Sequence, residues 1–175
     1  MKIPFYFLLA FLLVSCQSSN SPEVVVNGEL KQWHKVTLEL SGPESSEGAV
    51  QNPFLDFKLE VLFTKDNSSY KVPGYFAADG NAGESSASEG RIWKVHFRPD
   101  EPGTWNYKVS FREGKNIAIL DGTDLGDPVT LDGLEGSLEI GESDKGALDF
   151  RGQGRIVNGG KGYFRFQGTD QIWIK

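Results

Sequence analysis

Large apolar side chains alternate with polar ones over much of the chain, and this alternation predicts β-strands. Its two clearest runs lie within residues 90–114, on either side of a Pro- and Gly-containing segment at residues 99–103. The apolar positions are Trp93, Val95 and Phe97, then Trp105, Tyr107, Val109 and Phe111. A period of two residues places one set of side chains on a buried face and the other in water. Since Pro and Gly favour turns, we expect residues 90–114 to form a β-hairpin whose apolar face is covered by a second sheet.

Four further runs extend this prediction: residues 33–40, 54–63, 70–77 and 134–140. Pro73 cannot donate a backbone hydrogen bond, so we expect residues 70–77 to form an edge strand or a bulged one. Residues 79–90 have the composition of a loop, and residues 115–133 show no clear element. Six or seven short strands separated by turn signals predict an all-β fold, an antiparallel immunoglobulin/fibronectin-like β-sandwich. An eight-stranded jelly roll is the alternative.

The N-terminal end has the pattern of an export signal. Lys2 precedes an apolar run over residues 3–14, which is shorter than the about 20 residues that span a bilayer. The tetrapeptide Leu13-Val14-Ser15-Cys16 resembles the lipobox of bacterial lipoproteins. This resemblance implies cleavage before Cys16 and acylation of that cysteine, which would make the membrane a partner through a lipid anchor. We therefore expect the cell envelope, at the outer membrane or cell surface; the alternative is an ordinary secretory signal.

Acidic side chains outnumber basic ones. The chain has 24 Asp and Glu residues against 18 Lys and Arg residues, a net charge of −6 that becomes −7 when Lys2 is removed with the signal peptide. Binding to nucleic acid needs a basic patch, so this composition disfavours a nucleic-acid partner. Cys16 is the one cysteine, so a disulfide is not available and the domain must be stabilised by its packed core.

Sequence patterns for catalysis or metal binding are weak. Glycoside hydrolysis needs two carboxylates about 5 Å or about 6.5–9.5 Å apart on a rigid scaffold, whereas the acidic residues here fall in loops or at polar strand positions. The chain has no Gly-x-Ser-x-Gly motif. His34 and His96 lack a zinc-ligand spacing, and residues 121–127 do not match a calcium loop. We therefore expect no catalytic residue, no cofactor and no metal site.

Three aromatic residues lie outside the alternating pattern. Trp33, Phe54 and Tyr75 are out of phase with the predicted strands or lie in loops. Their rings are free either to stack on a ligand such as a sugar or to pack against a neighbouring domain. We predict that Trp33, Phe54 and Tyr75 form a ligand contact or an interdomain contact.

Several short motifs resemble an uncharacterised immunoglobulin-like domain found at the N-terminus of bacterial glycoside hydrolase-type proteins. They are Asn52-Pro53-Phe54, Val72-Pro73-Gly74-Tyr75 and Pro102-Gly103-Thr104-Trp105. In that family the domain precedes an apiosidase-like (β/α)₈ barrel, to which hydrolysis would belong. Residues 81–90 form a longer, serine-rich loop than is usual in the family, so we assign no binding role to them.

The resemblance implies a non-catalytic accessory domain that supports carbohydrate degradation. Its partner would be a polysaccharide or a glycoside hydrolase barrel. The alternative is a stand-alone carbohydrate-binding or adhesive surface module; in both cases we do not expect this chain itself to be an enzyme.

The expected organisation has four parts. Residues 1–15 form a signal peptide, residues 16–27 the lipidated Cys16 with a flexible stalk, and residues 28–141 the β-sandwich. Residues 142–175 form a linker and the start of a C-terminal barrel domain. Because residues 163–175 resemble the segment that leads into such a barrel, we expect the chain to stop before it.

Overall fold

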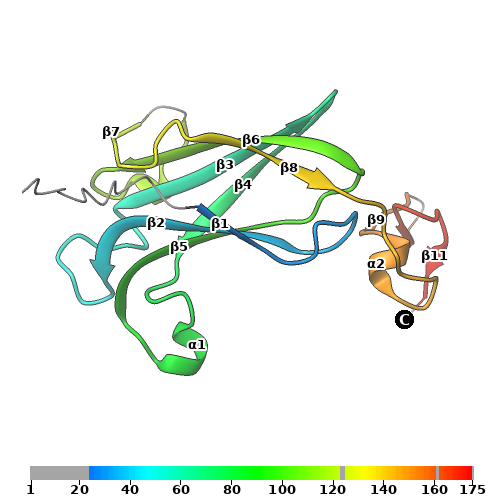
Figure 1. The fold of residues 1–175 in the computed structure, drawn as a ribbon, viewed down its shortest axis with the longest axis horizontal. Helices are drawn as coiled ribbons and strands as arrows, with labels where there is room; N and C mark the ends of the chain where they lie inside the picture. The colour runs from blue at the N-terminus through cyan, green and yellow to red at the C-terminus, as the bar shows by residue number, and fades with distance from the viewer. Residues whose placement is uncertain (1–23, 123–124, 161, 175) are drawn as a thin grey trace, which may run out of the picture.

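The computed structural model describes residues 24–122, 125–160 and 162–174, which form a β-sandwich followed by a small three-stranded sheet (Figure 1). The predicted signal peptide, Cys16 and most of the predicted stalk lie outside the described residues. The last four residues of that stalk differ from the prediction, because Val24–Asn27 form strand β1, which pairs with β2.

Two antiparallel sheets face each other across the core (Figure 1). The first sheet contains β1, β2 (Val36–Ser46), β5 (Glu89–Phe97) and the end of β4 (Ser68–Phe76). The second contains the start of β4, β3 (Phe57–Lys65), β6 (Gly103–Glu113), β7 (Asp127–Pro128) and β8 (Glu135–Ile140). The prediction of an all-β antiparallel sandwich is confirmed. Neighbouring strands pair in the orders β1-β2-β5-β4 and β3-β6-β8.

Strand β4 belongs to both sheets because it changes partner at Pro73. Residues 68–73 pair with β3, whereas residues 74–76 pair with β5. Pro73 has no N–H group to donate, and it lies where one ladder ends and the next begins. The strand expected at an edge of the sheet therefore crosses from one sheet to the other.

The predicted hairpin over residues 90–114 is wrong, although both of its strands exist. β5 pairs with β2 and β4, while β6 pairs with β3, β7 and β8, so the two strands lie in opposite sheets. The Pro-rich connection crosses the end of the sandwich instead of forming a hairpin turn. In a hairpin both aromatic faces would point to the same side, whereas in opposite sheets each face covers the other.

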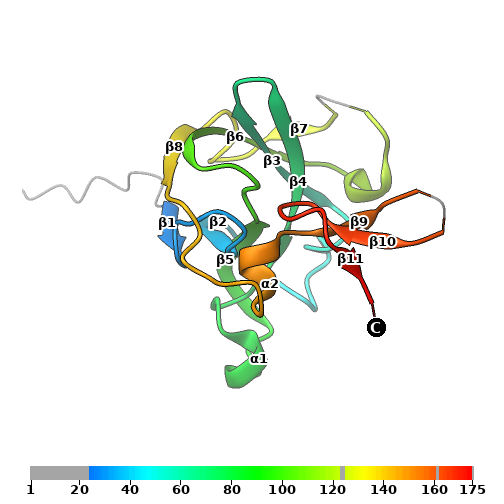
Figure 2. The same cartoon turned by 90° about the vertical axis from the view of Figure 1, so that its right-hand side faces the viewer.

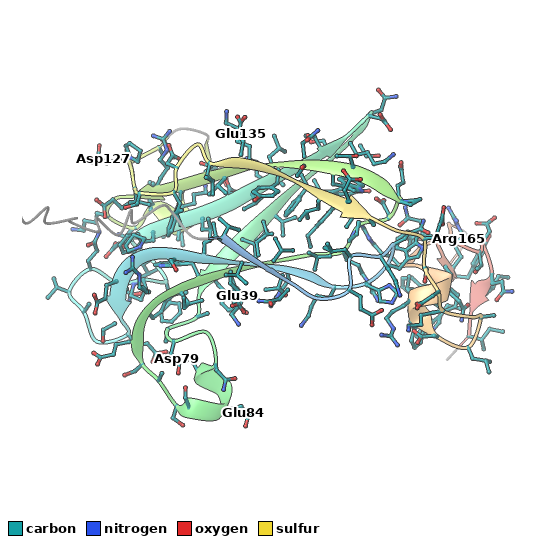
Figure 3. All side chains as sticks on the ribbon, in the orientation of Figure 1. Glu39, Asp79, Glu84, Asp127, Glu135 and Arg165 are labelled. Atoms are coloured by element: carbon teal, nitrogen blue, oxygen red, sulfur yellow. The ribbon has the colours of Figure 1, made fainter. Side chains whose placement is uncertain are left out.

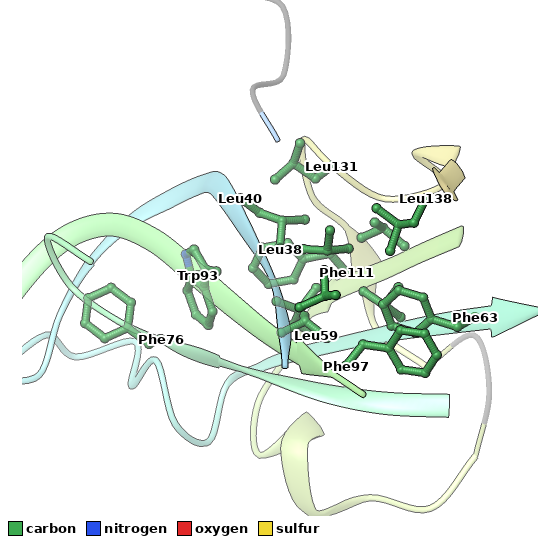
Figure 4. Close-up of a cluster of buried hydrophobic side chains, with 14 of the residues drawn as sticks. Leu38, Leu40, Leu59, Phe63, Phe76, Trp93, Phe97, Phe111, Leu131 and Leu138 are labelled. Carbon is green, nitrogen blue, oxygen red and sulfur yellow. The ribbon is translucent and has the colours of Figure 1, made fainter. Parts of the chain in front are cut away.

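Aromatic rings from both sheets fill the core along its length (Figure 4). Toward one end the rings of Trp93 and Phe111 meet edge to face, with centroids 4.8 Å apart. Toward the other end Phe63 stacks on Phe97 at 4.0 Å, and Phe97 meets Trp105 edge to face at 5.1 Å. Such pairs add to the stabilisation that comes from burial of apolar surface.

The two core tryptophans are buried without loss of hydrogen bonding. The indole N–H of Trp93 donates to the Pro43 carbonyl at 3.1 Å, and that of Trp105 donates to the Glu101 carbonyl at 2.9 Å. The predicted core positions of both tryptophans are confirmed, whereas Tyr107, also predicted for the core, is only half-buried.

The loops contain short elements that the sequence pattern did not reveal. Helix α1 (Ala82–Ser85) lies within the predicted loop before β5. A single turn of 3₁₀ helix, Ile117–Ile119, follows β6 and precedes β7.

Residues 142–174 form a small unit at one end of the sandwich (Figures 1 and 2). Helix α2 (Phe150–Gln153) precedes β9 (Ile156–Asn158), β10 (Phe164–Phe166) and β11 (Ile172–Trp173), which pair antiparallel in the order β11-β10-β9. The rings of Phe150 and Phe166 pack together at 5.6 Å, and Phe166 is buried. Figure 2, which looks onto this end, shows the three-stranded sheet and α2 in front of the sandwich.

Leu59 and Leu62 of β3 provide a matched test of which face of the strand is buried. Leu59 is 4% exposed in the core, and Leu62 is 39% exposed on the outer face. We expect Leu59→Ala to lower the free energy of unfolding by about 2–5 kcal/mol, because it leaves a cavity. Leu62→Ala should lower it by about 1 kcal/mol or less. Urea unfolding followed by tryptophan fluorescence measures both values, and equal losses would show that the face is assigned wrongly.

Candidate functional site

The strongest candidate site is the contact between the sandwich and the C-terminal segment, here residues 142–174. Trp33 lies in this contact, just before β2, and its side chain is buried. The backbone N–H of Trp33 donates to the Pro99 carbonyl at 2.8 Å, and the backbone carbonyl of Trp33 accepts a hydrogen bond from Arg98 Nε at 2.5 Å. Because its ring is buried, Trp33 is not open to a dissolved ligand.

The backbone of Trp33 is held in a strained conformation. Its φ angle is +65°, in the left-handed region that bulky residues rarely adopt. Such a conformation costs on the order of 1–3 kcal/mol and persists only where surrounding contacts fix it. The hydrogen bonds to Pro99 and Arg98 provide part of this restraint, and packing against the C-terminal segment provides the rest.

Two glycines allow the backbone of the C-terminal segment to approach the Trp33 ring. A Cβ atom at Gly154 would lie 3.1 Å from two carbons of the indole, and one at Gly168 would lie 3.2 Å from Nε1. Gly154 also has a φ angle of +91°, which other residues rarely adopt. The indole therefore packs directly on the backbone of the segment, and a side chain at either position would push the two apart.

Arg155, the first residue after Gly154, joins the same contact through its guanidinium. Its Cζ lies 4.8 Å from the ring centroid of Tyr70 and 5.9 Å from that of Trp33. Nη2 donates to the Arg98 carbonyl at 2.8 Å and lies 3.7 Å from Asp100 Oδ2. A guanidinium is attracted to aromatic faces, and its rigid set of donors can serve a carbonyl and a carboxylate together.

Asp100 is a buried charge in this contact. Its Oδ2 accepts hydrogen bonds from the Tyr70 hydroxyl and, at 3.4 Å, from Gln167 Nε2. Burial of the phenol, together with the bond to Asp100, raises the pKa of Tyr70. A buried carboxylate is stable only when it is paired and hydrogen-bonded. Two partners of Oδ2, Arg155 and Gln167, come from the C-terminal segment, whereas Oδ1 is buried without a hydrogen-bond partner among the described residues. The C-terminal segment therefore adds partners to a polar site begun by the sandwich.

Phe54 and Tyr75 lie together in a different place, where they border one groove of about 190 Å³ with Phe57 and Trp93. Phe54 is 51% exposed and Tyr75 is 44% exposed. The groove lies toward the Trp93 end of the core. Trp33 lies at the other end, where its backbone N–H is hydrogen-bonded to Pro99 in the connection between β5 and β6. The structure thus brings together two of the three predicted aromatic residues and separates the third from them.

Both exposed rings are held in place by neighbours. The Tyr75 hydroxyl and Nε2 of His96 are 3.0 Å apart, and Phe54 meets Phe76 edge to face at 6.1 Å. The groove is smaller than the about 300–1,000 Å³ of typical small-molecule pockets. Glu60 is the one carboxylate among its lining residues, so a pair of catalytic carboxylates is not assembled in it.

The remaining predictions concern the membrane anchor and the charged surface. Cys16, the predicted lipidation site, lies outside the described residues. Within the ranges that the structure describes, no helix has the length and apolar character needed to cross a bilayer. Charged side chains spread over the outer surface, as the labelled acidic residues show (Figure 3).

A metal site was not expected from the sequence, yet the fold brings three ligand types together. Of the described residues, Glu29, His34 and Asp144 form a group whose ligand atoms all lie within 4.8 Å of one another. Local spacing around His34 could not reveal this group, because Asp144 is far away in the sequence, at the start of the C-terminal segment.

Sequence reasoning also missed the polar residues of the Trp33 contact. Asp100 was assigned to a turn tip, Tyr70 to a strand, and Arg155 to a glycine-rich linker. The arginine between Gly154 and the strand residues that follow was the one local signal, since glycine next to a long cationic side chain permits close packing.

Much of the sandwich matches a known family model. Residues 29–112 match the family model described as "Domain of unknown function (DUF5060)". This range includes Trp33, Phe54, Tyr75 and Asp100, whereas Arg155 lies beyond it. No curated protein sequence matches the chain.

Among solved structures, the chain is similar to the crystal structure of a "putative glycoside hydrolase" from Bacteroides vulgatus ATCC 8482. The TM-score is 0.54 at 17% sequence identity, over 83% of this chain and 21% of that one. The chain therefore spans about a fifth of the length of that structure, and at this identity the likeness shows the fold.

Arg155 and Arg165 allow a matched test of the Trp33 contact. Arg165 lies in the C-terminal segment (Figure 3) and pairs with Asp170 of the same segment. We expect Arg155→Ala to speed cleavage within residues 142–174 by chymotrypsin about tenfold or more, because Asp100 loses its cationic partner. Arg165→Ala should leave the rate close to that of the unaltered chain. Equal rates for the two variants would show that Arg155 does not hold the segment.

Proposed function

We propose that this chain is a non-catalytic β-sandwich accessory domain of an exported, lipid-anchored glycoside hydrolase-type protein. Its role would be to hold and orient a domain that degrades carbohydrate. The observation that carries this proposal is the contact at Trp33, where the C-terminal segment supplies Arg155 and Gln167 as partners of the buried Asp100. A segment fixed in this way transmits the orientation of the sandwich to whatever it leads into.

The comparisons support the association with glycoside hydrolases. The structurally similar protein is described as a "putative glycoside hydrolase", and the match to this chain covers 21% of its length. In the proposed arrangement, residues 142–174 lead from the sandwich into a catalytic domain. Flexible linkers leave domain orientation free, whereas a segment that packs through Trp33, Gly154 and Arg155 restricts it.

The proposed location is the cell envelope, at the outer membrane or cell surface. It is supported by the sequence of residues 1–16, which has an apolar run and a lipobox-like ending at Cys16. Acyl chains on Cys16 would tether the sandwich to the membrane, and residues 17–23 would separate the two.

The sequence of the transcript beyond the codon for Lys175 tests the accessory role. We expect the reading frame to continue into a region that encodes a catalytic domain. The complete polypeptide should then hydrolyse polysaccharide, while residues 24–175 alone should release no reducing sugar. A stop codon directly after Lys175 would contradict the proposal.

A stand-alone carbohydrate-binding or adhesive module is the second candidate, and the groove beside Phe54 and Tyr75 favours it. Exposed, fixed aromatic rings can stack on sugar faces without a deep pocket. Affinity electrophoresis in gels that contain polysaccharide tests this function, with Phe54→Ala, Tyr75→Ala and the control Tyr163→Ala, which removes a partly exposed ring elsewhere. Under the accessory role we expect unchanged migration for all proteins. Retardation that is lost only in the Phe54 and Tyr75 variants would favour the second function.

A further inference from the structure

His34 has one ring nitrogen satisfied and one buried without a partner. The residue is 2% exposed, and Nδ1 lies 2.9 Å from the carbonyl oxygen of Gln32. A carbonyl oxygen can only accept, so Nδ1 carries the proton of this bond. Nε2 is buried and has no hydrogen-bond partner in the described part of the chain. A buried polar atom of this kind calls for a partner that the protein itself does not provide.

Two carboxylates face this nitrogen. Nε2 lies 3.6 Å from Glu29 Oε2 and 3.8 Å from Asp144 Oδ1, which is too far for a hydrogen bond. In the neutral ring the Nε2 lone pair points toward two carboxylates, and a cation bound by all three groups would remove the repulsion between them. The site therefore brings together one imidazole nitrogen and two carboxylate oxygens as possible metal ligands.

We propose that Glu29, His34 and Asp144 bind a divalent transition-metal ion, for which Zn²⁺ is the representative. Zinc takes imidazole nitrogen and carboxylate oxygen at about 2.0–2.2 Å, and these bond lengths set neighbouring tetrahedral ligands about 3.3–3.5 Å apart. The separations of 3.6 and 3.8 Å from His34 Nε2 are close to this spacing, and the three ligand atoms, which lie within 4.8 Å of one another, would draw together around the ion. Three protein ligands leave a fourth position for water.

The orientation of His34 supports this assignment. Metal-binding histidines usually donate the N–H of the other ring nitrogen to a carbonyl or carboxylate, which fixes the ring and the tautomer. The bond from Nδ1 to the Gln32 carbonyl has this form. His34 therefore needs no rearrangement of its ring to act as a ligand.

Cations lie near the two carboxylates and would compete with the metal for them. Lys31 Nζ lies 2.6 Å from Asp144 Oδ2 and 3.4 Å from Glu29 Oε2. Lys145 Nζ lies 3.2 Å from Asp144 Oδ1, and Arg151 Nη1 lies 3.9 Å from Glu29 Oε1. The hydrogen bond from Lys31 is the main cause that lowers the pKa of Asp144. Lys31 is partly exposed on a flexible stem, so its ammonium can move away when the metal binds.

The ion would join two parts of the molecule. Glu29 and His34 precede β2, whereas Asp144 lies just after Gly141, which pairs with Leu30 and Gln32 through the backbone. Metal binding would therefore fasten the start of the C-terminal segment to the sandwich, separately from the Arg155 contact.

Isothermal titration of residues 24–175 with ZnCl₂ after EDTA treatment tests this site, together with thermal unfolding. We expect one site per chain and a melting temperature that rises with Zn²⁺ concentration, because the ion binds the folded state. Asp144→Asn and Glu29→Gln, both at exposed positions, should weaken binding about tenfold or more. Glu135→Gln is the matched control, since it removes an exposed carboxylate that also pairs with a lysine, Lys108.

Two measurements separate this site from nonspecific binding. Lys31→Gln should tighten Zn²⁺ binding, since it removes the competing ammonium. In ¹H–¹⁵N spectra of the imidazole rings, Zn²⁺ should shift Nε2 of His34 and leave His96 unchanged. The proposal is overturned if Zn²⁺ at millimolar concentration produces neither heat nor stabilisation, or if Asp144→Asn and Glu135→Gln bind it equally well.

Discussion

The structure depends on the face-to-face packing of β5 and β6. Trp93 and Phe97 on one strand meet Phe111 and Trp105 on the other, and these contacts run along the whole core. Because the two strands follow each other in the chain, their connection must cross the end of the sandwich. That crossing places Asp100 at the edge of the core, where a charge is tolerated only with partners. The Trp33 contact is thus a consequence of how the core is covered.

Alternation of apolar and polar residues predicted which segments are strands and which face of each is buried, but it could not predict their partners. The β5 and β6 segments show this, since the same pattern fits a hairpin and a pair of facing strands. The absent N–H of Pro73 indicated an interrupted ladder, yet nothing local shows that a second ladder begins there. Pairing depends on contacts between distant residues, which a single sequence does not display.

The candidate sites divide in the same way. Trp33, Phe54 and Tyr75 could be recognised because large rings outside the strand period need a separate explanation. Asp100 and Arg155 carried no such signal, since a charged residue in a turn or a linker is ordinary. Their role depends on the fold, which buries Asp100 and brings Arg155 close to the Asp100 carboxylate. The same holds for His34, whose unpaired nitrogen is visible only in three dimensions.

The change of partner in β4 bears on which strand edges of the sandwich are open to pairing with another chain. An open sandwich has four sheet edges, and long exposed edges can pair with another chain. Because β4 continues from one sheet into the other, the two edges on that side are joined by one continuous strand instead of lying free in parallel. On the opposite side, the described edge of the first sheet is β1, which is only four residues long. The change of partner at Pro73 therefore shortens the length of β4 that each sheet presents at this side.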